Sequence, residues 1–251
     1  MSDGREGVHR DIEKFARGVE AEISASLEAA GHEVVRASEP VWTNRLAVGE
    51  ARRIAAGRPD LTVFNIPVWA FPHFSMLAAR ETPGPLLLFS NIDPGQPGMV
   101  GMLAAAGALD QIGRTYGRAY GDVSDPAVMT RLEAHVSAGA AVRALQGSTF
   151  GRIGGRPMGM YTAVSNADQW MEKFGVDVEE IDQWELVRRS GEVDGRKVRA
   201  AREWLEEHAA GVHYDGKRLT PELLERQIRT YYAMRGLIAG EDRCPVRGLQ
   251  A

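Results

Sequence analysis

The sequence predicts an α/β fold with a doubly wound, mainly parallel sheet (Rossmann- or flavodoxin-like), followed by a second, incomplete α/β domain. Three observations support this prediction. Short apolar runs alternate with helical patterns along the chain, as in a parallel sheet with helices on both faces. The run 85–89 (PLLLF) is continuous enough for a strand buried on both faces. A turn-rich loop over 90–98 and a small-residue helix follow it, and open sheets bind ligands at such strand ends.

The elements of the first domain follow from periodicity and from end signals. Apolar residues recur at helical spacing from Ile12 to Leu27, and Gly31 lies where a C-cap is expected. Asp125 and Pro126 are an N-cap and a first-turn proline, so they open a long helix. In chain order we expect a strand over 33–37, helix 44–56, strand 61–66, helix 74–81, strand 85–89, helix 99–112, a strand around 114–120 and helix 125–146.

The sequence pattern changes at Gly147, which predicts a boundary between an N-terminal domain, 1–147, and a partial second domain, 148–251. The second domain is expected to contain strands 148–153 and 176–181 and helices 168–174, 183–190, 195–209 and 221–238. No strand is expected before the loop at Asp3, where a doubly wound domain normally has one, and none after Ile181. We therefore expect a chain that is cut at both ends.

Composition limits the classes of function. The 251 residues are 44% apolar and 25% charged with a net charge of −4, which is ordinary for a globular protein and favours neither a nucleic-acid nor a membrane partner. No apolar run reaches membrane-spanning length, and the N-terminus lacks the apolar core of a signal peptide. The single cysteine, Cys244, forms no internal disulfide and is interpreted as a bystander. A cytoplasmic protein is the simplest interpretation.

Two loops at strand ends are candidate ligand sites. In Asp3-Gly4-Arg5-Glu6, the guanidinium offers a fixed fork of donors for hydroxyl or carboxylate groups. The alternative is a frayed, charged terminus. In the segment 67–72 (PVWAFP), Trp69 and Phe71 can form a stacking wall for the apolar face of a sugar ring. The alternative is ordinary aromatic packing between helix and sheet.

The glycine-rich segment 151–161 (GRIGGRPMGMY) follows an expected strand and resembles a phosphate-binding turn. It matches neither dinucleotide nor P-loop fingerprints. Arg152 and Arg156 can bind anions, whereas Pro157 removes a backbone donor. We favour a tight turn that lets the backbone approach a ligand or another subunit.

Two clusters of acidic residues each allow a structural interpretation as well as a functional one. The first cluster can ligate a metal or can lie on a solvated helix face: Glu206, Glu207, His208, His213 and Asp215. The other, 177–185, places carboxylates on a strand and can serve acid–base chemistry. An acidic helix N-terminus at Asp182 explains it equally well and is favoured. The chain has no GxSxG motif and no Cys–His pairing, so nucleophilic acyl transfer is unsupported.

Three stretches resemble the L-fucose/L-arabinose isomerase family, specifically its L-fucose isomerase-like members. They are DGREGVHR near the start, PVWAFP followed by NIDPGQPGMVGMLAAAGALDQIG, and GRIGGRPMGMYTA followed by FGVDVEEIDQWELVRR. The segment LLERQIRTYYAMRGLI resembles the family's next helix. The likeness covers nearly the whole chain in the family's order.

The resemblance implies an aldose–ketose isomerase of carbohydrate metabolism. A divalent metal, usually manganese (Mn²⁺), polarises two sugar oxygens in such enzymes while carboxylates move a proton through an enediol. The family's ligands, a Glu, an Asp and a His, lie in the second half of a longer chain. The Glu lies in a segment resembling ATEADMDGALTM, which does not occur here. The resemblance therefore implies no metal ligand and no catalytic residue in this chain.

What the resemblance does carry over is a substrate-facing surface. In the family's hexamer, the N-terminal domain of one subunit covers a neighbour's active site. Arg5, Trp69 and Met158 match positions that touch the aldose or deoxy-sugar substrate. We therefore interpret the chain as the N-terminal part of an isomerase, inactive without a C-terminal part that a separate chain can supply. The alternatives are a non-catalytic sugar-binding or regulatory module, a nucleotide-binding α/β protein and a truncated gene product.

Overall fold

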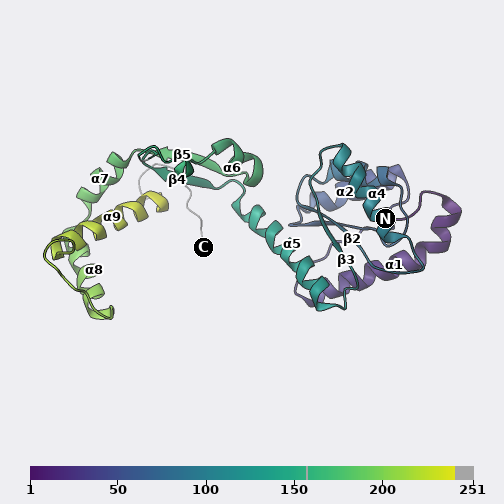
Figure 1. The fold of residues 1–251 in the computed structure, drawn as a ribbon, viewed down its shortest axis with the longest axis horizontal. Helices are drawn as coiled ribbons and strands as arrows, with labels where there is room; N and C mark the ends of the chain where they lie inside the picture. Colours follow the sequence, from purple (N-terminus) through teal and green to yellow (C-terminus); the bar gives the residue numbers. More distant parts are fainter. Residues whose placement is uncertain (157, 241–251) are drawn as a thin grey trace. The chain divides into compact units, whose positions relative to one another are not determined.

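The structure, a computed structural model, describes residues 1–156 and 158–240. The chain divides into two compact units, Met1–Ala144 and Leu145–Ala251 (Figure 1). In the described part of the chain, no helix combines the length and the apolar character needed to cross a membrane.

From α2 onward, helices and strands alternate in the first unit, as the sequence predicts. Its elements are α1 (Glu6–Ala29), α2 (Asn44–Ala56), β1 (Thr62–Asn65), α3 (Pro72–Glu81), β2 (Leu86–Ser90), α4 (Gly98–Gln111), β3 (Gly117–Tyr120) and α5 (Pro126–Leu145).

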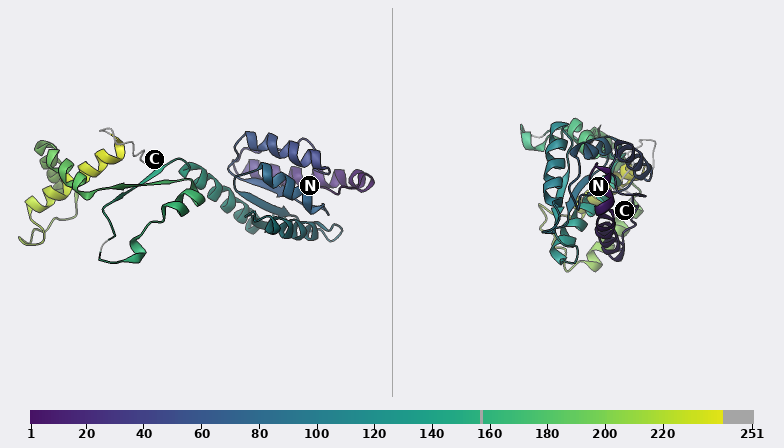
Figure 2. Two further views of the ribbon diagram at one scale, coloured as in Figure 1. Left: turned by 90° about the horizontal axis from the view of Figure 1, so that it is seen from above. Right: turned by 90° about the vertical axis from the view of Figure 1, so that its right-hand side faces the viewer.

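The sheet of the first unit has three parallel strands in the order β1-β2-β3. Strand β2 is buried at every position because it lies between two strands and between two helical layers. Leu88 packs into a cluster with α2, α3 and α4, whereas Leu87 and Phe89 pack with α1 and α5. Figures 1 and 2 show these layers on the two faces of the sheet. The predicted α/β class is thus confirmed.

The prediction of a strand over 33–37 is wrong. These residues belong to no sheet, and they form no backbone–backbone hydrogen bond with other described residues. The segment begins just after α1, where the N–H of His32 closes the helix end on the carbonyl of Leu27. A cavity lies between the segment and the edge of β1, so no neighbouring strand is close enough to pair with it.

The second unit combines a two-stranded parallel sheet with four α-helices in its described part. Its strands are β4 (Thr149–Ile153) and β5 (Asp177–Ile181), with Gly151 opposite Glu179. Its helices are α6 (Ala167–Phe174), α7 (Gln183–Glu192), α8 (Gly195–His208) and α9 (Pro221–Ala239), besides a short 3₁₀ turn, Tyr161–Ala163. Helix α9 packs against α7 and α8, and α6 packs against β5.

Candidate functional site

The loop before α1 lies at the carboxyl end of β1. The Met1 amine donates to the carbonyl of Asn65, the last residue of β1, and the N–H of Ser2 donates to Val41. Asp3 follows with only 1% of its surface exposed. A frayed terminus therefore does not describe this loop, and a buried carboxylate lies at the ligand-binding edge of a parallel sheet.

Asp3 holds the guanidinium of Arg5 in a two-pronged ion pair. Arg5 Nε donates to Asp3 Oδ1 at 2.9 Å and Nη2 donates to Oδ2 at 2.7 Å, while the Arg5 backbone N–H also reaches Oδ1. These side-chain hydrogen bonds lower the pKa of Asp3, and the carboxylate raises the pKa of Arg5. The Arg5 side chain remains 65% exposed. A buried anion thus fixes the direction of an exposed fork of donors.

The second predicted segment, 67–72, contacts this loop. A Cβ on Gly4 would lie 2.5 Å from a ring carbon of Phe71, so only glycine lets the two loops approach this closely. Phe71 also packs against Phe74, with ring centroids 5.9 Å apart. Phe71 therefore fits the packing interpretation, whereas the neighbouring Trp69 is only partly buried. The sequence-predicted residues Arg5 and Trp69 thus belong to two loops that touch through Gly4 and Phe71.

A third loop, 90–98, reaches the same edge of the sheet. Ser90 Oγ donates to the carbonyl of Ile66 at 2.9 Å. A Cβ on Gly98 would lie 2.6 Å from the carbonyl oxygen of Pro67, and one on Gly101 would lie 2.9 Å from that of Val68. These two glycines let the start of α4 press onto the segment that carries Trp69.

Two side chains at this edge were missed by the sequence reasoning. The Oδ1 atoms of Asn65 and Asn91 are buried and have no hydrogen-bond partner among the described residues. Buried polar atoms are normally satisfied, so these acceptors are available to a donor such as a hydroxyl group. The signal was present in the sequence, because one Asn ends a buried strand and the other follows the next strand along the chain.

Met158 belongs to the second unit. It is 94% exposed and has a positive φ of 43°, between Gly154 and Gly159, which also have positive φ. Residues 158 and 159 form a turn, in agreement with the tight turn expected in this segment. Arg152 is held by Glu180 at 2.7 Å and Arg156 lies over the ring of Tyr161, so both cations have partners in the chain. Pro157 lies outside the described residues.

The acidic groups form no metal centre within residues 1–156 and 158–240, where no three His, Cys, Asp or Glu side chains are grouped to hold an ion. The carboxylate of Asp215 accepts hydrogen bonds from the backbone N–H groups of 217–219, which lowers the pKa of Asp215. The carboxylate of Glu206 accepts a hydrogen bond from the hydroxyl of Tyr214. Asp182 accepts from the N–H of Trp184 and caps α7, as favoured above. Cys244 lies outside the described residues.

Comparison with known proteins agrees with the resemblance found in the sequence. Residues 1–147 match the family model described as "L-fucose isomerase, first N-terminal domain". No curated protein matches the chain. The matched range covers more than half of the 251 residues and contains both Arg5 and Trp69. The chain therefore belongs to the L-fucose isomerase family, and its residues 1–147 correspond to the first N-terminal domain of that family.

Proposed function

We propose that this chain is the substrate-facing N-terminal part of an L-fucose isomerase-like enzyme that converts an aldose or deoxy-aldose into a ketose. Arg5, Trp69 and Met158 contact the sugar in this proposal. The observation that carries it is the ion pair of Arg5 with the buried Asp3, because it aims an exposed guanidinium outward at the carboxyl edge of a parallel sheet.

Arg5 is suited to binding and unsuited to proton transfer. Asp3 occupies Nε and Nη2, and Nη1 has no hydrogen-bond partner in the described part of the chain. The remaining N–H groups can donate to sugar hydroxyls. A guanidinium stays protonated at any working pH, and Asp3 raises its pKa further. Arg5 therefore orients the substrate, and the base that moves the proton must come from another part of the enzyme.

The residues described here do not fit a manganese site, since no group of three ligand side chains occurs among them. We propose that the Mn²⁺ of the isomerase reaction is bound by a C-terminal part of the enzyme. That part is either a separate chain or a further segment of the same protein. We also propose that the active form is a homo-oligomer in which this N-terminal part covers a neighbour's site.

An assay of ketose formation tests the proposal. The purified chain is mixed with L-fucose and Mn²⁺, with and without a separately expressed C-terminal half of a related isomerase. Activity is expected only in the mixture. Arg5→Lys keeps the charge beside Asp3 but loses the fork, so KM is expected to rise about ten- to a hundredfold with a smaller change in kcat.

Arg10→Lys is the matched control. Arg10 is exposed in the first turns of α1, and Glu6 is its only ion-pair partner among the described residues, so this variant is expected to behave like the wild type. An unchanged KM in the Arg5→Lys variant would show that Arg5 does not contact the substrate. Isomerase activity of the chain alone would contradict the proposal that it needs a C-terminal part. Sugar binding without activity in either arrangement would favour a non-catalytic sugar-binding module.

A further inference from the structure

His9 is the first buried residue of α1, and it contacts the loop that carries Arg5. Only 6% of the surface of His9 is exposed. Its backbone N–H donates to the carbonyl of Arg5 at 2.9 Å, in the first turn of the helix. Its ring nitrogen Nδ1 lies 2.9 Å from Oγ of Ser2, which is fully buried. His9 therefore holds the chain on both sides of the buried Asp3.

The imidazole of His9 also stacks on Trp42. The two ring planes are inclined by only 8°, and their centroids lie 4.7 Å apart. Trp42 follows Val41, whose carbonyl accepts the backbone N–H of Ser2 at 2.8 Å. Ser2 is thus held by its N–H and by its hydroxyl. Histidine suits this position because it combines a flat ring with a polar atom bonded to Cγ.

The surroundings of Nε2 indicate which group donates in the contact of His9 with Ser2. Nε2 lies 3.8 Å from a carboxylate oxygen of Glu13. A hydrogen on Nε2 is attracted by this carboxylate, whereas a bare Nε2 would set a lone pair against it. The neutral ring therefore carries its proton on Nε2. Nδ1 is then an acceptor, and the hydroxyl of Ser2 donates to it.

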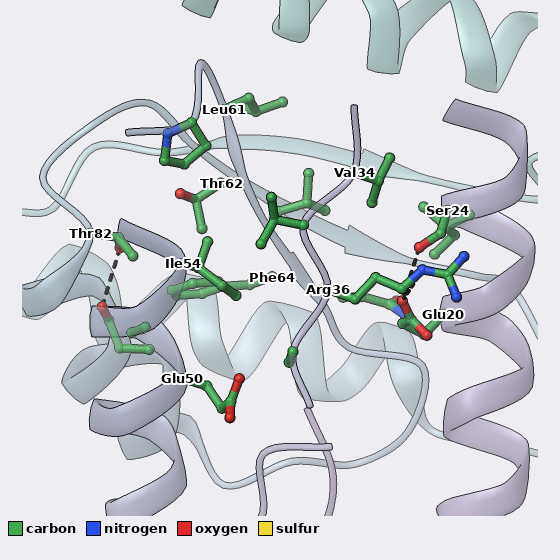
Figure 3. Close-up of a pocket in the computed structure, with 18 of the residues that line it drawn as sticks. Glu20, Ser24, Val34, Arg36, Glu50, Ile54, Leu61, Thr62, Phe64 and Thr82 are labelled. Atoms are coloured by element: carbon green, nitrogen blue, oxygen red, sulfur yellow. Dashed lines mark hydrogen bonds and ion pairs between the residues drawn. The ribbon is translucent and has the colours of Figure 1, made fainter. Parts of the chain in front are cut away.

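A second buried serine on α1 makes a comparable bond away from this loop. A cavity of about 420 Å³ lies beside β1, and Ser24 and Glu20 lie on its wall (Figure 3). The hydroxyl of Ser24 donates to Oε1 of Glu20 at 2.9 Å, and Ser24 is 4% exposed. Ser2 and Ser24 thus share the same chemistry and depth, but only Ser2 adjoins Asp3. Ser24 therefore provides a matched control.

We propose that His9 is a positioning residue for Arg5, because its bond to Ser2 and its stack on Trp42 hold the loop where Asp3 directs the guanidinium. The two-pronged ion pair of Arg5 requires the carboxylate and the guanidinium to be aligned, so a shift of Ser2 loosens it. A small displacement of a group that orients substrate weakens binding. This role rests on the proposed function, in which Arg5 contacts the sugar. The buried imidazole acts on the sugar only through Arg5.

NMR of the Arg5 Nε–H group in the full chain tests the positioning without an assay of activity. Asp3 is expected to slow exchange of this hydrogen with water. Ser2→Ala removes one hydroxyl and is expected to speed the exchange at least about threefold. His9→Phe keeps the ring but loses Nδ1, so it is expected to act similarly, and the double variant is expected to match either single one. Ser24→Ala is expected to leave Arg5 unchanged.

The isomerase assay with the C-terminal half connects the position of Arg5 to substrate binding. Ser2→Ala and His9→Phe are expected to raise KM for L-fucose about three- to tenfold, with a smaller change in kcat. His9→Asn places an acceptor near the position of Nδ1 and is expected to restore part of this loss. His9→Ala removes both the ring and the acceptor and is expected to have the largest effect. Ser2→Ala keeps the test decisive if His9→Ala does not fold.

Unchanged exchange at Arg5 Nε–H in both Ser2→Ala and His9→Phe would overturn the proposal. So would an equal effect of Ser24→Ala, because Arg5 would then respond to any loosening of α1. Additive effects of Ser2→Ala and His9→Phe would also overturn it, since the two side chains would act separately. Faster exchange with an unchanged KM would support the role of His9 and would contradict the contact of Arg5 with the sugar.

Discussion

The two units differ in how they bury apolar surface. The first contains two hydrophobic clusters on opposite faces of its sheet, and several of the largest side chains in them are fully buried. In the described part of the second, few apolar side chains are buried and many large ones are exposed. The exposed ones include Phe150, Met158, Tyr161, Trp184, Trp204 and Tyr231. Burial therefore stabilises the first unit far more than the second.

Local hydrogen bonds show the opposite distribution. Each α-helix of the second unit from α6 to α9 begins with a side chain that accepts a hydrogen bond from the first turn: Asn166, Asp182, Asp194 and Thr220. In the first unit, α1, α3 and α4 begin without such a bond. A helix pressed against a sheet is fixed by packing, whereas a helix with little tertiary contact depends more on its cap.

The same core substitution in each unit gives the largest expected difference. Leu88→Ala, at the centre of β2, is expected to cost about 2–5 kcal/mol, near the upper end because Leu88 is fully buried. Leu237→Ala, in α9, is expected to cost about 2 kcal/mol at most, because the surrounding helices can relax into the gap. Urea unfolding followed by hydrogen exchange in each unit measures both. Equal costs would mean that burial is shared more evenly than the exposed side chains indicate.

Two glycines of one helix test the close packing of the first unit. Gly101→Ala places a Cβ 2.9 Å from the carbonyl oxygen of Val68, so α4 or the loop must shift, at about 1–3 kcal/mol. Gly107→Ala on the same helix meets nothing within 4 Å and is expected to stabilise by about 0.5–1 kcal/mol. Urea denaturation compares the two variants. Similar effects of both would show that α4 does not press on the loop that carries Trp69.

The sequence predicts the features that depend on local signals, and it fails for those that depend on tertiary packing. Local signals such as the apolar run before Ser90 and the acidic N-terminus at Asp182 predict elements in both units, because each signal acts within a few residues. The segment 33–37 has strand composition, yet pairing depends on a distant edge that periodicity does not describe. At the candidate site, Arg5 is visible in the sequence. The burial of Asp3 and the contact of Gly4 with Phe71 require the folded chain.

The smallest expected effect compares one cap in two settings. Thr43 and Thr220 each accept a backbone N–H at 3.2 Å, from Leu46 and Leu223 respectively. Replacing either by Ala is expected to cost about 1 kcal/mol, and replacing either by Ser is expected to keep most of the bond. The difference between the two helices should appear in the amide hydrogen exchange of their first turns. Thr220→Ala is expected to speed amide exchange in the first turn of α9.

The matched variant, Thr43→Ala, is expected to leave the first turn of α2 protected, because Ala47 is fully buried one turn into that helix and holds it to the core. NMR exchange rates of the two first turns, normalised to the middle of each helix, separate the effects. Equal fraying of both helices would mean that packing adds nothing to the start of α2. The caps would then be equally necessary in a unit with a large core and in one without it.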